Sequence, residues 1–179
     1  MGEDELTYAK AGVDIEASEE ATAALINSVR DIDTDAYAGF IDIGDQYLAL
    51  TTDGVGTKLL VAAAVDKYST IGIDCIAMNV NDLVAAGFLP VAFVDYLAIE
   101  SPDEALTEAI GEGLAVGAEE ASVNLVGGET AVMPEVIRGF DLAGACLGIT
   151  QKDAVLDGTA APGDKIIGWE SNGIHSNGL

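Results

Sequence analysis

The segment Asp53-Gly54-Val55-Gly56-Thr57-Lys58 is the most informative stretch of this sequence. It brings a carboxylate, two glycines, a hydroxyl and an ammonium group together directly after the apolar run 47–52. A strand that leads an acid into a glycine turn, followed by a cation, offers the groups that bind Mg²⁺ and polyphosphate. Cations are scarce here, because the chain has 7 Lys and Arg against 31 Asp and Glu. We therefore interpret the segment as a functional turn between a strand and a helix.

The composition indicates a folded domain with an acidic surface. Half of the 179 residues are hydrophobic and 21% are charged, so the chain has enough apolar side chains for a core. The formal net charge of −24 makes nucleic acid and anionic membranes poor partners. The acids are spread along the whole chain, and at molar salt the Debye length of about 3 Å would screen their repulsion. We expect a halophilic protein.

Three further features of the sequence favour a cytoplasmic location. The acidic start Met1–Glu5 is not followed by an apolar signal segment. The longest charge-free run, 83–94, is too short to span a bilayer. Cys75 and Cys146 each lie in an apolar run, and we expect reduced thiols in the core instead of a disulfide or a metal site.

The spacing of apolar residues predicts an α+β domain with a mixed sheet. Helices are expected over residues 18–29, with Ser18 as the N-cap, and over 59–65, 70–87 and 103–121. Strands are expected over residues 38–43, 46–52, 91–99, 123–126, 140–150 and 165–169. Gly44-Asp45 is a hairpin signal between the first two strands. The sheet should be mixed because strands and helices do not alternate strictly.

Three acids lie where metal ligands would be useful. Asp53 enters the glycine turn, and Asp82 lies near Asn79 in an otherwise apolar helix. Burying such polar groups is costly unless they are satisfied. A hydrated Mg²⁺ would satisfy them, and a solvent-facing position is the alternative. Glu129 follows Gly127-Gly128 at the expected end of a strand, where ligands often bind in α/β-type sheets.

Lys58 and Lys10 are the candidate phosphate-binding cations, although a lysine is usually a solvated surface group. Glycine pairs such as Gly127-Gly128 let the backbone approach phosphate oxygens closely, and Thr130 offers a hydroxyl beside that pair. These positions predict a phosphorylated ligand.

Asp74 and His175 are less certain candidates. Asp74 lies two helical turns before Asp82 and could face the same side, but it could equally be an acid at a helix edge. His175 is the only histidine, and within Gly173–Gly178 it could bind an anion or simply occupy a turn. The sequence has neither the G-x-x-x-x-G-K-[ST] loop nor a G-x-G-x-x-G that opens a βαβ unit. These residues indicate an enzyme that handles Mg²⁺ and a phosphorylated ligand.

Six motifs together resemble one enzyme family. They are Tyr8-x-Lys10-x-Gly-Val-Asp14, Asp53-Gly-Val-Gly-Thr-Lys58, Ile71-Gly-Ile-Asp74, Asn79-x-Asn-Asp-Leu83, Leu125-Val-Gly-Gly-Glu-Thr130 with Met133-Pro134, and His175-Ser-Asn-Gly178. In this order they resemble the phosphoribosylformylglycinamidine cyclo-ligase family, also called AIR synthetase. The resemblance extends from Tyr8 to Gly178, which is nearly the whole chain.

The resemblance implies an α+β fold in which helices pack on one face of a mixed sheet and the sheet pairs across a homodimer. It implies a mobile N-terminal arm over 1–16, an ATP-binding and dimerisation domain over 17–170, and the start of a truncated second domain over 171–179. Members of the family are far longer, and their substrate cleft lies between two domains. We therefore expect that turnover requires more than this chain.

The resemblance also implies a reaction in purine biosynthesis. Formylglycinamidine ribonucleotide would be closed to aminoimidazole ribonucleotide at the expense of ATP, through phosphorylation of the formyl oxygen. Asp53, Asp82 and Glu129 would hold Mg²⁺. The ATP-binding residues would be Lys10, Gly54, Gly56, Thr57, Lys58, Asn79, Gly127, Gly128, Glu129 and Thr130. His175, Ser176, Asn177 and Gly178 would line the substrate side, and the catalytic residues would be Asp53, Lys58, Asp82 and His175.

Other functions share part of this pattern. Formylglycinamidine ribonucleotide synthetase, selenide water dikinase and thiamine-monophosphate kinase have a similar Asp…Asn-Asp…Gly-Gly-Glu/Asp order. The residues of 53–58 and 10–14 favour the cyclo-ligase. A function of a different class is a dimerising, nucleotide-binding fragment without turnover.

Overall fold

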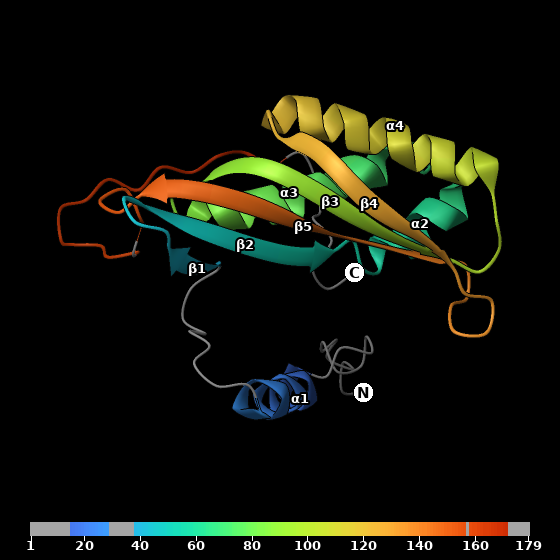
Figure 1. The fold of residues 1–179 in the computed structure, drawn as a ribbon, viewed down its shortest axis with the longest axis horizontal. Helices are drawn as coiled ribbons and strands as arrows, with labels where there is room; N and C mark the ends of the chain where they lie inside the picture. The colour runs from blue at the N-terminus through green and yellow to red at the C-terminus, as the bar shows by residue number, and fades with distance from the viewer. Residues whose placement is uncertain (1–14, 29–37, 157, 172–179) are drawn as a thin grey trace, which may run out of the picture.

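The structure is a computed structural model that describes residues 15–28, 38–156 and 158–171 of the chain. These residues form four α-helices and five β-strands (Figure 1). The elements are α1 (Ile15–Ser28), β1 (Gly39–Asp42), β2 (Gln46–Gly54), α2 (Lys58–Val65), α3 (Ser69–Ala85), β3 (Leu89–Ile99), α4 (Glu104–Ala121), β4 (Asn124–Val132) and β5 (Phe140–Gln151).

The five strands form one mixed sheet in the order β1-β2-β5-β3-β4. The pairs β1·β2, β2·β5 and β3·β5 are antiparallel, whereas β3 and β4 are parallel. The parallel pair is connected through α4, as a parallel connection requires a crossover. The predicted mixed sheet and the predicted hairpin at Gly44-Asp45 are both confirmed.

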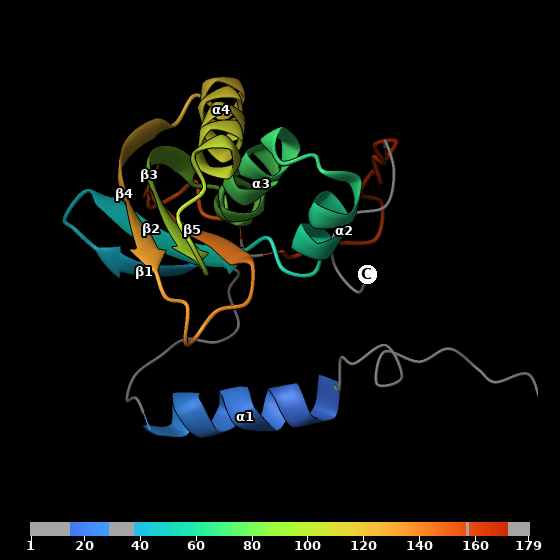
Figure 2. The ribbon, with the colours of Figure 1, turned by 90° about the vertical axis from the view of Figure 1, so that its right-hand side faces the viewer.

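The helices α2, α3 and α4 lie on one side of the sheet (Figure 2). The core lies between these helices and the sheet, because burial of apolar surface is the main driving force for folding. Side chains with no exposed surface include Ile71, Cys75, Leu83, Phe93 and Leu142. The expected packing of helices on one face is confirmed for α2, α3 and α4.

The contact between α3 and α4 depends on glycines. A Cβ atom at Gly113 would overlap the carbonyl oxygen of Ser69, and one at Gly72 would overlap the backbone of α4 near Leu114. Any larger side chain would push the two helices apart. This close approach fixes α3 against α4, and α3 also contacts β2, β5 and β3.

Two helices begin and end as the sequence predicts. The carboxylate of Asp103 accepts a hydrogen bond from the backbone N–H of Leu106 at 3.0 Å, so Asp103 is the N-cap of α4. After the last residue of α3, Gly87 has a φ of +84°, a conformation that favours glycine. The helix predicted over 70–87 is therefore confirmed, with α3 ending at Ala85.

Three predictions about local structure are wrong. Helix α1 begins at Ile15, so Ser18 lies inside it instead of capping it, and Glu16 supplies the acid that suits the first turn. Strand β4 does not end before the glycine pair, because its pairing with β3 continues to Val132. Residues 165–169 are not a strand, and Ile166 and Trp169 are 99% and 95% exposed without a neighbouring strand in the described chain.

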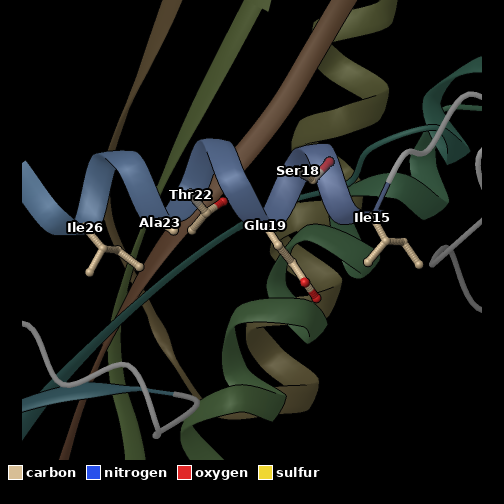
Figure 3. A pocket seen from close by; sticks show the side chains of 6 residues that line it. All are labelled: Ile15, Ser18, Glu19, Thr22, Ala23 and Ile26. Atoms are coloured by element: carbon tan, nitrogen blue, oxygen red, sulfur yellow. The ribbon is translucent and has the colours of Figure 1, made fainter.

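Helix α1 lies apart from the sheet and the other helices in both views (Figures 1 and 2). None of its residues is buried. Its Ile15, Ser18, Glu19, Thr22, Ala23 and Ile26 line a hollow along one side of the helix (Figure 3). This hollow contains none of the predicted site residues. In the described chain, no helix has the length and apolar character needed to cross a membrane.

Candidate functional site

Asp53 lies at the end of β2, on the face of the sheet that the helices cover. Thr51, two residues earlier on the same face, donates a hydrogen bond from Oγ1 to the carbonyl oxygen of Asn79 at 3.0 Å. Asn79 donates from Nδ2 to the carbonyl oxygen of Asp53 at 3.3 Å. These two bonds tie the end of β2 to α3, so the acid is delivered beside that helix.

The glycine turn connects β2 to α2 tightly. The carboxylate of Asp53 accepts the N–H of Gly54 at 2.7 Å, and Val55 donates its N–H to the carbonyl oxygen of Leu142 at 2.9 Å. Gly56 has a φ of +67°, which lets the chain reverse into the helix that begins at Lys58. The turn predicted from the sequence is confirmed as a strand-to-helix connection.

Asp82 on α3 is the second carboxylate of the site. It is half-buried, and its pKa is raised first by this burial and then by the negative charge of Asp53. It has no ion-pair partner among the residues that the structure describes. Two carboxylates that repel each other in this way would be stabilised by a shared cation.

Asn79 lies on α3 three residues before Asp82, and its side chain is fully buried. Its Nδ2 donates to the carbonyl oxygens of Asp53 and Cys75, the latter at 3.0 Å. Because both partners are acceptors, the amide orientation is fixed, and Oδ1 is left without a hydrogen-bond partner. Asn79 therefore positions Asp53 through the backbone.

Lys58 is paired with an acid. Its Nζ lies 2.8 Å from Oδ1 of Asp74 on α3, and the two side chains are 24% and 29% exposed. Asp74 thus points toward the same 53–58 segment as Asp82 does. The sequence left the position of Asp74 open between a functional and a helix-edge acid, and the structure brings it into the site.

The predicted residues on β4 lie elsewhere. Between β2 and β4 stand β5 and β3, so β4 is distant from Asp53. Phe93 and Leu97 of β3 face the helices, so Tyr96 faces the opposite, uncovered side of the sheet. Glu129 pairs in register with Tyr96 and therefore lies on the uncovered face as well. The structure does not bring Glu129 together with Asp53 and Asp82. Gly127 lies beside Val94, and Thr130 lies in register with Leu97. Gly127 and Thr130 are both exposed.

Asp95 on β3 was missed by the sequence analysis. Its carboxylate occupies the space that a Cβ atom of Gly128 would fill, so the glycine leaves room for it. Burial raises the pKa of the Asp95 carboxyl, because it lies on the helix-covered face. An acid at an inward position of the apolar run 91–99 is the signal that could have revealed it.

Both cysteines are free and buried, as predicted. Burial raises the pKa of the Cys75 thiol to about 12, with further contributions from Asp95 and Asp53. Burial likewise raises the pKa of Cys146 to about 11. Such thiols are unreactive at neutral pH and serve as core side chains.

The remaining predicted residues lie outside the described residues. They are Lys10, His175, Ser176, Asn177 and Gly178. Within the described ranges, no group of three or more His, Cys, Asp or Glu side chains could hold a metal ion. Asp53 and Asp82 nevertheless fit Mg²⁺, which is often held by one or two carboxylates together with substrate phosphates and water. The pKa of Asp82 is raised first by burial and then by the charge of Asp53, and such an ion would stabilise the charged form of Asp82.

A family model described as "AIR synthase related protein, N-terminal domain" matches residues 35–150. The chain is 53% identical over 188 residues to phosphoribosylformylglycinamidine cyclo-ligase of Thermococcus kodakarensis, covering 97% of this chain and 56% of that protein. It is 51% identical over 188 residues to the same enzyme of Methanosarcina barkeri, covering 99% of this chain and 56% of the relative. The chain therefore spans little more than half the length of these curated relatives.

Solved structures share the fold. The crystal structure of tt0281 from Thermus thermophilus matches with a TM-score of 0.66 and 23% identity, covering 82% of this chain and 48% of that chain. PurL of T. maritima complexed with ATP matches with a TM-score of 0.62 and 20% identity, covering 78% of this chain and 23% of that chain. These identities are low, so the two structures support the α+β fold alone.

Proposed function

The chain belongs to the AIR synthase related protein family, and from this premise we propose that it is the nucleotide-binding part of a phosphoribosylformylglycinamidine cyclo-ligase. The observation behind the proposal is the pair of half-buried carboxylates, Asp53 and Asp82, which repel each other beside a glycine turn. A carboxyl group with a raised pKa, as at Asp82, is frequent in functional sites.

In this proposal Asp53 and Asp82 hold Mg²⁺. The ion, when bound, would neutralise phosphate charge and orient the triphosphate for phosphoryl transfer. Asn79 keeps the backbone of Asp53 in place through its hydrogen bond. Glu129 is separate from these two carboxylates, because it lies on the uncovered face.

The phosphates would be bound by the turn itself. Gly54 and Gly56 allow phosphate oxygens to approach the backbone closely, as glycine turns do elsewhere, while the N–H groups of Gly54 and Val55 already donate to Asp53 and Leu142. Thr57 and Lys58 follow at the start of α2, beside these amides. Lys10 would add a second ammonium group, and residues 175–178 would line the substrate side; both assignments rest on the motif resemblance.

The proposed reaction closes a ring in formylglycinamidine ribonucleotide. ATP phosphorylates the formyl oxygen, an amidine nitrogen attacks the activated carbon, and phosphate leaves as the imidazole of aminoimidazole ribonucleotide forms. Positioning and charge neutralisation provide most of the rate enhancement in phosphoryl transfer of this kind. The names of the curated relatives support this reaction, and their additional length would supply the other side of the substrate cleft.

We also propose a homodimer that forms through the uncovered face of the sheet. Strand register puts Ile41, Leu50, Leu89 and Val94 on this face, where they are 62%, 59%, 66% and 40% exposed. Contiguous apolar surface of this kind usually marks an interface. A second copy of the same sheet would cover it.

The domain assignment of 17–170, with an arm over 1–16 and a second domain from 171, is retained as a proposal. The strongly exposed Ile166, Ile167 and Trp169 support the presence of further protein that covers them. A halophilic setting is proposed from the net charge of −24, and a cytoplasmic location from the two free, buried cysteines. Transfer to dilute buffer should then unfold or dissociate the protein, and a monodisperse, folded dimer at low salt would contradict the halophilic proposal.

Two alternatives have specific support. AaThiL complexed with AMPPCP and TMP shares the fold with a TM-score of 0.58 and 16% identity, so formylglycinamidine ribonucleotide synthetase, selenide water dikinase or thiamine-monophosphate kinase is one alternative. A nucleotide-binding fragment without turnover is supported by the coverage of only 56% of the relatives. The cyclo-ligase is favoured because the named relatives are about half identical over nearly the whole chain.

Product analysis tests the proposed reaction. Formylglycinamidine ribonucleotide and Mg-ATP would be incubated with the 179-residue chain and, separately, with a chain extended to the length of its relatives. We expect aminoimidazole ribonucleotide from the extended chain, identified by mass. If a folded extended chain instead yields a thiamine diphosphate or selenophosphate from the corresponding substrates, a kinase assignment replaces this one.

A further inference from the structure

The ion pair between Lys58 and Asp74 is the most shielded of the three ion pairs among the described residues. Its side chains are 24% and 29% exposed, compared with 82% and 39% for Arg138 and Glu100. Partly buried pairs are screened less by salt than exposed ones. The charge of Lys58 is therefore largely offset by its neighbour.

This pairing sets the charge of the glycine turn. Among the described residues, the Lys58 ammonium group is paired with Asp74, whereas the carboxylates of Asp53 and Asp82 have no ion-pair partner. Two negative charges remain in excess, and one divalent cation would cancel them. A polyphosphate that arrives without a cation meets net repulsion, although a lysine stands beside the turn.

We propose that Asp74 sets the metal requirement of this site, by occupying the Lys58 ammonium group so that polyphosphate without a divalent cation is refused. The inference rests on the proposed nucleotide site and adds a specificity-determining residue to it. Asp53 and Asp82 remain the groups that face the cation, whereas Asp74 acts through Lys58. Without the Asp74 charge, Lys58 would be available to phosphate oxygens and the excess negative charge would fall by one.

If Asp74 had only a structural role, its loss would affect the affinities for Mg-ATP and for metal-free ATP in the same way. Loss of a structural pair would weaken the binding of Mg-ATP and of metal-free ATP together, because both need the same turn. The proposed role predicts that the variant binds metal-free ATP more tightly relative to Mg-ATP than the wild type does. The ratio of the two dissociation constants is therefore the informative quantity.

The experiment is calorimetric titration of ATP, once with Mg²⁺ and once with EDTA, at matched ionic strength. The 179-residue chain is compared with Asp74→Asn, which removes the charge and keeps the shape. We expect metal-free ATP to bind the variant about tenfold more tightly than the wild type. Adding Lys58→Met to Asp74→Asn should abolish this gain, because the freed ammonium group is its cause.

Asp45→Asn is the matched control. Asp45 is exposed in the β1–β2 turn, and its substitution makes the same change in net charge. It should leave the affinity ratio unchanged. Asp74→Ser removes the same charge with a smaller side chain and replaces Asp74→Asn if that variant does not fold.

The outcomes separate this proposal from the one it rests on. If wild type binds Mg-ATP but Asp74→Asn gains no affinity for metal-free ATP, the role of Asp74 is overturned and the nucleotide site stands. If the folded wild-type chain binds no Mg-ATP, the nucleotide site fails and this inference fails with it. If neither Asp74→Asn nor Asp74→Ser folds, the pair is structural and the inference is overturned.

Discussion

Helix α3 meets α4 with glycine-mediated packing, whereas it meets the Asp53–Lys58 turn with the carboxylates of Asp74 and Asp82. On the α4 side, Gly72 and Gly113 allow the backbones to approach so closely that a Cβ atom would overlap the neighbouring chain. On the turn side, the pKa of Asp82 is raised by burial and by a second carboxylate. One side of the helix is completed by the fold, whereas the other side carries Asp82, which has no ion-pair partner among the described residues.

The difference separates residues that stabilise the fold from residues that we propose act in the site. Repulsion between two half-buried carboxylates costs stability, so the fold gains nothing from keeping them. Clusters of this kind are frequent at sites where a charged ligand binds. Substitutions on the two sides of α3 should therefore affect different measurements.

Gly113→Ala should cause the largest effect, on stability. A Cβ atom would collide with the Ser69 carbonyl group, and overpacking of this severity costs about 3 kcal/mol. Urea unfolding measures the free energy. Gly111→Ala is the control, because nothing lies within 4 Å of its Cβ position and the same helix should gain up to about 1 kcal/mol. Equal losses at both positions would mean that the glycine contact does not determine the packing.

Asp82→Asn should affect binding and leave the fold intact. Removal of one of two carboxylates that face the cation should weaken Mg-ATP binding at least about 100-fold, equivalent to about 2.7 kcal/mol. Calorimetry measures the affinity, and circular dichroism checks the fold. Asp45→Asn, with the same charge change, should bind normally. Unchanged affinity in Asp82→Asn would remove this residue from the site.

Leu50→Lys extends the comparison to the face of the sheet that the helices leave uncovered. A charge placed in the proposed sheet-to-sheet interface should weaken dimerisation at least about tenfold, equivalent to about 1.4 kcal/mol. Sedimentation velocity measures the assembly. Leu60→Lys is the control on α2, where the side chain is 71% exposed on the opposite side of the domain. Equal dissociation in both variants would argue against this interface.

The smallest effect should be on the pH dependence of stability, where substitution of Asp82 and of Asp42 should change the free energy of unfolding in opposite directions. The folded-state pKa of Asp82 is raised, so its charged form is disfavoured in the folded state at neutral pH. Asp82→Asn should therefore be more stable than wild type at pH 7, by about 0.5 kcal/mol. This advantage should disappear as the pH falls through the raised pKa.

Asp42 is the opposite case, because its hydrogen bond from Lys152 lowers its pKa. Its stabilising contribution is present above the unfolded-state pKa and is lost as the pH falls through the lowered folded-state pKa. Asp42→Asn should therefore be less stable than wild type at neutral pH. The free energy of unfolding of both variants is measured by chemical unfolding between pH 3 and pH 7, a range that includes the ordinary carboxyl pKa of about 4. A common sign for the two would contradict the assigned environments.

Most of the fold could be predicted because its elements have strong local signals. The apolar run of α3, the N-cap Asp103 and the Gly44-Asp45 hairpin each specify their structure within a few residues. Strand β4 extends further than expected because its length is set by pairing with β3, which no local pattern reveals. The expected strand over 165–169 failed because no partner strand lies beside it in the described chain.

The candidate site was predictable only where the residues are close in sequence or share a helix. Asp53 and Lys58 are joined by the glycine turn, and Asp82 follows Asp74 on α3. The face of Glu129 could not be predicted, because it depends on a register shift between β3 and β4 next to Val94. The pairing of Lys58 with Asp74 depends on how α2 sits against α3, which is a tertiary property.

The most direct test of the account is calorimetric titration of Mg-ATP into the 179-residue chain in concentrated KCl, repeated with EDTA and with Asp53→Asn. We predict saturable binding by the wild type, which disappears with EDTA and is strongly weakened in Asp53→Asn. Absence of binding by a demonstrably folded chain, or equal binding by Asp53→Asn, would contradict the assignment of the nucleotide site to the Asp53–Lys58 turn.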